Sequence, residues 1–146
     1  MTEQIFYEDI EAGTEMPALI KHPSTRQLVK WAGASGDYYE LHYDKDFAQR
    51  AKLPGVIVHG MLQMSFLGQL MTDWIGNEGT LKKMNCNFTA MLSPGADVAC
   101  KGRVSKKHVE GGEHLVECEL WLENSKGEKT TQGTAVVALP SKGSGG

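Results

Sequence analysis

The 146-residue sequence predicts one α+β domain in which an antiparallel β-sheet wraps around a long central helix. The stretch after Gly60, MLQMSFLGQLMTDWIG, has apolar residues nearly all round a helical cylinder and one charge, Asp73. We therefore expect a core helix that other elements enclose. The last half of the chain holds four segments with alternating apolar residues, separated by glycine-containing turns, which is typical of long antiparallel strands.

A shorter helix is expected in the first third of the chain. Ser24 or Thr25 is suited to cap its start and Gly33 or Gly36 to end it, which gives about three turns. The preceding segment, IFYEDIEAGTEMPALIK, is predicted to form short extended pieces joined at a glycine and a proline.

The segment between the two helices, residues 37–59, is polar, aromatic and without a clear period. It contains a predicted helical turn at 44–51, a break at Pro54-Gly55 and an apolar, strand-like run at 56–58. Ordered segments of this kind often carry function, so candidate site residues are sought here first.

The four predicted strands lie in LKKMNCNFTAML, DVACKGRVSKKHV, EHLVECELWLEN and EKTTQGTAVVAL, and we expect them to follow one another as a meander. The third alternates most regularly, so one sheet face should be buried and the other wet. Residues 1–140 are thus predicted to form a single domain, and residues 141–146, SKGSGG, a disordered tail.

Charge and cysteine content argue against several classes of protein. The chain has 15 Lys and Arg against 18 Asp and Glu and lacks a run of five basic residues, so we expect no nucleic-acid partner. Cys86, Cys100 and Cys118 form no CxxC pair, which indicates buried thiols instead of a disulfide framework or zinc knuckle. With an acidic N-terminus and no 18-residue apolar stretch, the sequence predicts a cytoplasmic protein and no membrane partner.

Asp37 and His42 are the first candidates for chemistry. They lie five residues apart, directly after the predicted glycine-terminated helix. Spacing alone favours a capping aspartate and a surface histidine. If the loop turns both side chains toward one small volume, however, they can share a water molecule as acid and base.

His59 and Gly60 stand at the junction between the apolar run and the core helix. The first turn of a helix leaves backbone N–H groups unpaired and carries positive dipole, so a carbonyl oxygen arriving there would be polarised. Gly60 would allow close approach, although a glycine that only makes a tight turn is an equal alternative.

The stretch SGDYYELHYDKDFAQRAKLPGVIVHGM resembles the hydratase motif of the MaoC-like dehydratases, the (R)-specific enoyl-thioester hydratases. In that motif an Asp and a His five residues apart are followed about 17 residues later by HG and the central helix of a hotdog fold. Together with the order of elements, the resemblance covers residues 24–139. It implies a hotdog dimer that acts on thioesters of coenzyme A or acyl carrier protein.

The sequence departs from the commonest family motif, in which an Asn-Pro pair lies between the Asp and the His. Tyr39-Glu40 stands there instead, which removes a fixed φ and a loop-orienting amide, so the loop needs other support. DYYELH is similar to a subset of the family that acts on bulky CoA esters such as steroid side chains, in paired or heteromeric assemblies.

The resemblance also implies the roles of individual residues. Asp37 and His42 would hold the water and exchange protons with it and with the α carbon, with the acid and the base left unassigned between them. The Gly60 N–H would stabilise the enolate-like oxygen, and no metal or redox cofactor is required. Apart from the resemblance, further residues around these three are candidates for substrate binding, with core or interface packing as the alternative, namely Tyr38, Tyr39, His59, Met61 and Ser65.

The sequence leaves two alternative functions open. A hotdog thioesterase would hydrolyse the same substrates, but many such enzymes use a carboxylate on the central helix, and residues 60–70 contain none. A non-catalytic acyl-binding subunit of a heteromer would be expected to lose Asp37 or His42, and both are present. A homodimer is expected and a heteromer remains possible.

Overall fold

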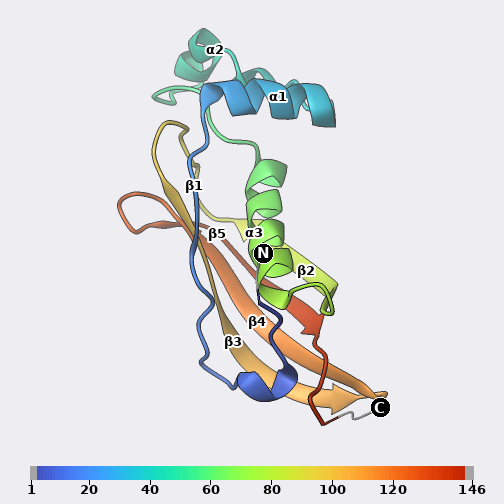
Figure 1. Cartoon of the computed structure of the whole chain (residues 1–146). Helices are drawn as coiled ribbons and strands as arrows, with labels where there is room; N and C mark the ends of the chain where they lie inside the picture. The colour runs from blue at the N-terminus through green and yellow to red at the C-terminus, as the bar shows by residue number, and fades with distance from the viewer. Residues whose placement is uncertain (1–2, 144–146) are drawn as a thin grey trace.

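The structure, a computed structural model, describes residues 3–143 and confirms the α+β fold (Figure 1). Five strands form an antiparallel sheet in the order β1-β3-β4-β5-β2. The strands are β1 (Leu19–Lys21), β2 (Thr80–Phe88), β3 (Val98–Glu110), β4 (Glu113–Glu123) and β5 (Lys129–Ala138). The helices are α1 (Thr25–Ser35), α2 (Lys45–Arg50) and α3 (Gly60–Ile75), with 3-10 turns η1 (Tyr7–Asp9) and η2 (Glu40–His42).

The predicted meander is only partly correct. β3, β4 and β5 follow one another, but β2 pairs with β5 instead of β3 and forms one edge of the sheet. β1, which pairs with β3, forms the other edge. Alternation in a strand reports which side chains face the core and does not report which strand lies alongside, so the sequence could not place β2.

The sheet buries one face against α3, as alternation predicts. In β4 the side chains of Val116, Cys118, Leu120 and Leu122 are buried, and the residues between them are partly exposed. α3 runs along this face (Figure 1), and burial of its apolar side chains is the main source of stability.

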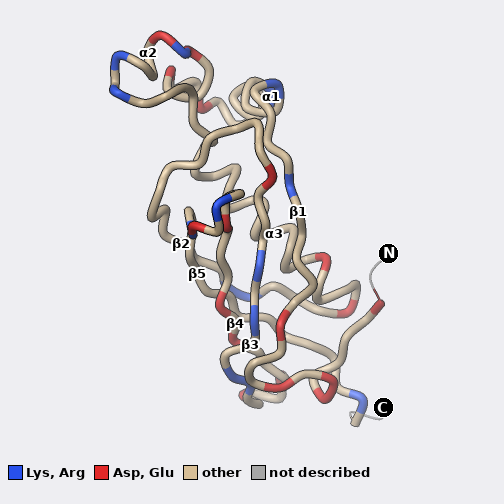
Figure 2. Tube along the Cα trace, turned by 90° about the vertical axis from the view of Figure 1, so that its left-hand side faces the viewer, with Lys and Arg blue, Asp and Glu red and all other residues tan. Residues whose placement is uncertain are grey.

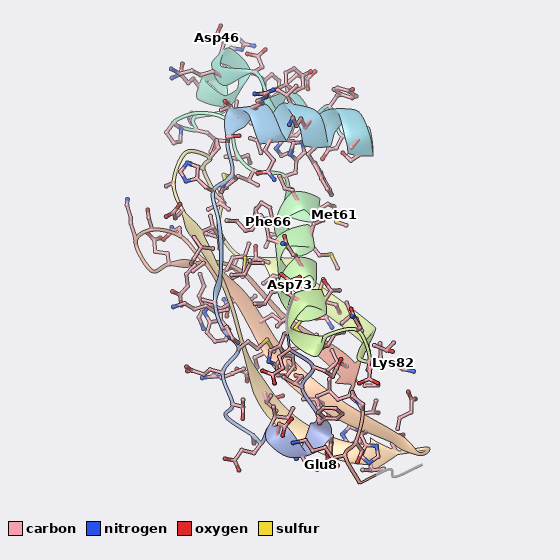
Figure 3. The ribbon with its side chains drawn as sticks, viewed as in Figure 1. Glu8, Asp46, Met61, Phe66, Asp73 and Lys82 are labelled. Carbon is pink, nitrogen blue, oxygen red and sulfur yellow. The ribbon has the colours of Figure 1, made fainter. Side chains whose placement is uncertain are left out.

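α3 is not enclosed on every side, contrary to the prediction. Met61, Ser65, Gln69 and Thr72 recur every three or four residues and form an exposed stripe along it. Figure 3 shows Met61 and Phe66 projecting from opposite sides of the first half of the helix. Met61 is apolar and yet exposed, so apolar residues around the whole helix did not mean burial on every side.

α1 ends at the predicted residues. The Ser24 side chain accepts a hydrogen bond from the Gln27 N–H at 3.1 Å, and Gly36 ends the helix with φ 81°. A left-handed backbone at this position favours glycine. In Figure 1, α1 lies across the molecule beyond the N-terminal end of α3.

The expected helical turn is α2, with Asp44 as its N-cap. Residues 56–58 are extended but form no strand, so that expectation is wrong. Their backbone is held instead by two long-range hydrogen bonds, from the Ile57 N–H to the Leu41 carbonyl at 3.1 Å and from the Val58 N–H to the Leu92 carbonyl at 2.8 Å.

All three cysteines are free thiols, and burial raises the pKa of Cys100 and Cys118 to about 12. In the predicted tail, Ser141 and Lys142 hydrogen-bond Glu8, while residues 144–146 lie outside the described part. Lys and Arg are interspersed with Asp and Glu at both ends of the molecule (Figure 2). No helix within residues 3–143 is long and apolar enough to cross a membrane.

Candidate active site

Asp37 and His42 meet at the end of α1. The η2 turn, in which the His42 N–H donates to the Tyr39 carbonyl at 3.0 Å, brings the His42 ring back toward Asp37. The carboxylate Oδ2 lies 3.8 Å from His42 Nε2. Asp37 is exposed and His42 is buried, so the pair faces solvent through the carboxylate. The spacing of these residues could suggest this meeting, but only the turn produces it.

A backbone carbonyl sets the tautomer of His42. His42 Nδ1 lies 2.8 Å from the carbonyl oxygen of Ile57. Because a carbonyl oxygen only accepts hydrogen bonds, Nδ1 carries the proton, and Nε2 of the neutral ring presents a lone pair toward Asp37. Sequence reasoning missed Ile57, since a backbone acceptor leaves no residue-type signal.

His59 lies directly behind His42. The two rings stack with centroids 3.9 Å apart and planes 20° apart, and His59 has no exposed surface. Burial lowers the pKa of His59, and the neighbouring His42 lowers it further. A side chain without exposed surface cannot touch a ligand in this conformation, so this placement does not favour the expected contact between His59 and substrate.

Gly60 is the first residue of α3, with His59 as its N-cap. The first backbone hydrogen bond of the helix runs from the Gln63 N–H to the His59 carbonyl, so the N–H of Gly60 precedes that ladder. A Cβ on Gly60 would lie 2.9 Å from the Phe88 ring. A larger residue at this position would therefore force the Phe88 ring or the helix start to move. Phe88, half exposed at the end of β2, borders the site without any signal in the sequence.

A polar network beneath the first turn of α3 was also missed. Gln63 Oε1 accepts hydrogen bonds from Thr131 at 2.8 Å and Thr130 at 3.4 Å, and all three residues are buried. Gln63 Nε2 donates to the Val58 carbonyl at 3.4 Å. The network joins the helix start to β5 and to the segment that carries Ile57. An amide in an apolar helix is the only sequence signal for it.

A cavity of about 410 Å³ opens beside His42, within the size range of small-molecule sites. Asp37 and Gly60 are not part of its wall. It is lined by Thr25, Val29, His42, Tyr43, Lys45, Pro54, Gly55, Val56, Ser93 and Pro94.

The other predicted binding residues surround the pair at different distances. Tyr39 packs edge-on against both His42 and Phe47 and holds the loop, while its N–H donates to Asp37 Oδ1 at 3.3 Å. Because the loop lacks the Asn-Pro pair, these contacts of Tyr39 hold it instead. Tyr38 is exposed. Met61 and Ser65 lie on the exposed stripe of α3, where the Ser65 hydroxyl donates to the Met61 carbonyl at 2.9 Å.

Asp37, His42 and His59 each place one potential metal-ligating atom within 4.8 Å of the others. A tetrahedral zinc site needs nitrogen ligands about 2.0–2.1 Å from the ion, each directing its lone pair in the plane of its ring. Two imidazoles stacked face to face cannot both do so toward one ion without reorientation. The arrangement therefore fits a proton-transfer site better than a metal centre.

The sheet, the central helix and the residues at its N-terminus together define a hotdog-fold domain. A family model for the MaoC-like domain matches residues 9–126. The chain belongs to this family, the MaoC-like dehydratases, as its motif suggested.

Individual relatives agree with this assignment. The chain is 26% identical to an (R)-specific enoyl-CoA hydratase from Rhodospirillum rubrum, over 94% of each chain. It is 29% identical over 99 residues to the fatty acid synthase subunit beta of Saccharomyces cerevisiae. This match covers 66% of the present chain but only 5% of that much longer relative. The unliganded R-hydratase PhaJ1 from Pseudomonas aeruginosa has the same fold, with a TM-score of 0.86 and 22% identity over 97% of this chain and 89% of the other.

Proposed function

We propose that this protein hydrates a trans-2-enoyl thioester to an (R)-3-hydroxyacyl thioester and catalyses the reverse dehydration. The observation that carries the proposal is the 3.8 Å separation of Asp37 Oδ2 and His42 Nε2, with His42 Nδ1 held by Ile57. A water molecule between these atoms would be within hydrogen-bond reach of both. The enoyl-CoA hydratase relative supports the choice of reaction.

The tautomer of His42 favours one assignment of roles. Its unprotonated Nε2 accepts a proton from the water as the water oxygen attacks the β carbon. Asp37 orients the water and stabilises the imidazolium that forms. The imidazolium then delivers its proton to the α carbon, which leaves His42 neutral again. Dehydration follows the same steps in reverse.

The Gly60 N–H is proposed to bind the thioester oxygen as negative charge develops on it. It lies at the positive end of α3, and losing one such donor typically raises a barrier by about 3 kcal/mol. As proposed, the reaction needs only groups of the polypeptide. The substrate would be an acyl-CoA or acyl carrier protein thioester, with Tyr38, Tyr39, Met61 and Ser65 as candidate contacts beyond the cavity.

A second copy of the chain is the proposed partner. β2 pairs with β5 on one side only, and a nine-residue strand with a free edge is a ready site for further pairing. α3, which carries the exposed stripe with Met61, packs beside β2. A homodimer would cover both surfaces, and a heteromer with a related subunit would use the same edge.

The alternatives make different predictions for the same purified protein. Many hotdog thioesterases use a carboxylate on the central helix, whereas the α3 carboxylate, Asp73, lies in the last turn and is exposed (Figure 3). A non-catalytic subunit would bind acyl-CoA without turnover. Retention of both Asp37 and His42 favours the hydratase.

The test is an ultraviolet absorbance assay of enoyl-CoA hydration across chain lengths and a steroid enoyl-CoA. We expect Asp37→Asn and His42→Ala to lower kcat by at least about a hundredfold, the scale of general acid–base catalysis. His22→Ala, at an exposed histidine paired with Asp97 outside the site, is the matched control and should match wild type. Unchanged rates in both site variants would defeat the mechanism, and binding without turnover would favour the non-catalytic subunit.

A further inference from the structure

His59 touches each part of the candidate site without reaching solvent. Its ring stacks on His42 with 3.9 Å between centroids, and its exposed fraction is 0%. It is also the N-cap of α3, so its backbone directly precedes the Gly60 amide. These two contacts join a proton-transfer group to the helix start through one residue.

A third contact reaches the Asp37 loop. His59 Nε2 lies 3.3 Å from the backbone carbonyl oxygen of Asp37. The carbonyl only accepts, so this nitrogen is the donor and Nδ1 is unprotonated in the neutral ring. Two further hydrogen bonds of Asp37 are local, from its N–H to Ser35 Oγ and from the Tyr39 N–H to its carboxylate. The bond to His59, by contrast, spans 22 residues and ties the loop to the start of α3.

The environment of the remaining nitrogen of His59 indicates that packing alone does not explain a histidine at this position. Nδ1 is buried and has no hydrogen-bond partner among the described residues. An unpaired buried acceptor costs about 1–3 kcal/mol, and a phenylalanine of similar shape would avoid that cost. On another side of His59 the Trp31 ring approaches edge-on, with ring centroids 6.5 Å apart. The Nε2–H donor is therefore the property that phenylalanine could not supply.

We propose that His59 is a positioning residue. It fixes the positions of the Asp37 backbone and the His42 ring relative to the Gly60 amide. The proposal rests on the hydration reaction proposed above. Its effect on rate follows from geometry, because a displacement of about 1 Å in a catalytic group can cost about a hundredfold in rate. Tyr39-Glu40 makes this anchor more important, since the loop lacks the fixed φ of a proline.

Two variants separate the donor from the ring. His59→Phe keeps an aromatic ring against His42 and removes the N–H, while His59→Gln removes the ring and can place an amide N–H near the Asp37 carbonyl. We expect His59→Phe to lower kcat for an enoyl-CoA by about 10- to 100-fold with a change in KM below about threefold. In His59→Gln the fall in log kcat relative to wild type should be at most about half of that in His59→Phe. Thermal unfolding should show His59→Phe at least as stable as wild type.

Trp31→Phe is the matched control. It changes a second side chain that packs against His59 and whose Nε1 is likewise buried and unpaired within the described residues, but it leaves the Asp37 contact intact. Its kcat should equal that of wild type. In the Asp37→Asn background, His59→Phe should have little further effect, because residues that act through one another are not additive.

Amide hydrogen exchange of residues 36–41 provides a readout that does not depend on turnover. We expect exchange there to become about tenfold faster in His59→Phe and to stay unchanged in Trp31→Phe. If the wild type hydrates no enoyl-CoA, the proposed function fails, and exchange alone then decides the role of His59. Wild-type kcat in His59→Phe, a rise in KM without loss of kcat, or unchanged exchange would each overturn the positioning role.

Discussion

The two ends of α3 are built from different materials. Among residues 3–143 the buried polar side chains gather around its first turn, and we name this set the polar end: His42, His59, Gln63, Thr130 and Thr131. Its last turns bury only apolar side chains, and we name this set the apolar end: Leu70, Met71, Trp74 and Ile75.

The difference indicates that the apolar end stabilises the fold and that the polar end carries the candidate site. Apolar burial is non-directional and favours folding wherever it occurs. A buried polar group must find partners or lower stability, and His59 Nδ1 has none among the described residues. We infer that apolar burial at the apolar end offsets the free-energy cost of the buried polar groups, an arrangement that folding alone would not select.

The largest expected effect on stability comes from the apolar end. Met71 has an exposed fraction of 0%, and Met71→Ala should lower the free energy of unfolding by about 2–5 kcal/mol through lost burial and a cavity. Urea denaturation measures this change. The hydration kcat per folded molecule should stay near that of wild type, since Met71 lies far along the helix from Gly60.

Thr72→Ala is the neighbouring control, because Thr72 is exposed on the same turn and its loss should change stability by at most about 0.5 kcal/mol. A large loss of kcat in Met71→Ala would contradict the division between the two ends.

The next effect falls on activity at the polar end. In Gly60→Ala the new methyl would meet the Phe88 ring at 2.9 Å and displace either the ring or the helix start. We expect a loss of kcat/KM of about 10- to 100-fold, measured with the best enoyl-CoA.

Gly68→Ala provides the matched control within the same helix. A Cβ there would lie 3.7 Å from Met84, an ordinary contact, so alanine should raise stability by about 0.5–1 kcal/mol and leave turnover unchanged. If Gly60→Ala retained wild-type activity, the close approach at Gly60 would serve packing alone. Recovery in the Gly60→Ala/Phe88→Ala double variant would identify the ring as the source of the displacement.

A smaller effect is expected within the buried network. Thr131→Val removes the hydroxyl that donates to Gln63 Oε1 at 2.8 Å and should lower stability by about 1–2 kcal/mol. Adding Gln63→Met removes the unpaired acceptor but also takes the partner from the Thr130 hydroxyl and the Val58 carbonyl, so it should restore only part of that loss. Chemical denaturation of the two single variants and the double variant gives the coupling energy. Strictly additive losses would show that the network contributes nothing beyond packing.

The sequence predicted the apolar part of this comparison well. Burial periodicity placed α3 and the long strands, and the capping residues Ser24 and Gly36 placed α1, because these signals are local. The position of β2 at the sheet edge depended on long-range pairing and was missed.

The polar part was predicted only as a set of residue types. The motif identified Asp37, His42 and Gly60, but η2 brings Asp37 and His42 together, and the stacking of His59 on His42 brings the start of α3 beside them. The tautomer of His42 depends on a carbonyl from Ile57, and a backbone oxygen is the same in every residue. The burial of His59 behind His42 likewise follows from tertiary packing, which no local pattern encodes.

The last prediction concerns acid. The pKa of His59 is lowered in the folded protein from its usual 6.5, because burial and the nearby His42 disfavour the charged ring. Above pH 6.5 the ring is neutral in both states and costs nothing. As pH falls below 6.5 the unfolded chain takes up a proton that the folded chain refuses, so stability is lost until pH passes the lowered folded pKa. One proton changes the free energy of unfolding by at most about 1.4 kcal/mol per pH unit.

Denaturation at about pH 7.5 and about pH 5.5 measures this loss, because the two values lie on either side of the usual histidine pKa. His59→Gln has no proton to take up and should lose less stability across the same interval than wild type. Trp31→Phe keeps the buried imidazole and should lose as much as wild type. An equal loss in His59→Gln would mean that His59 is not the group responsible, and that the polar end tolerates acid better than its burial implies.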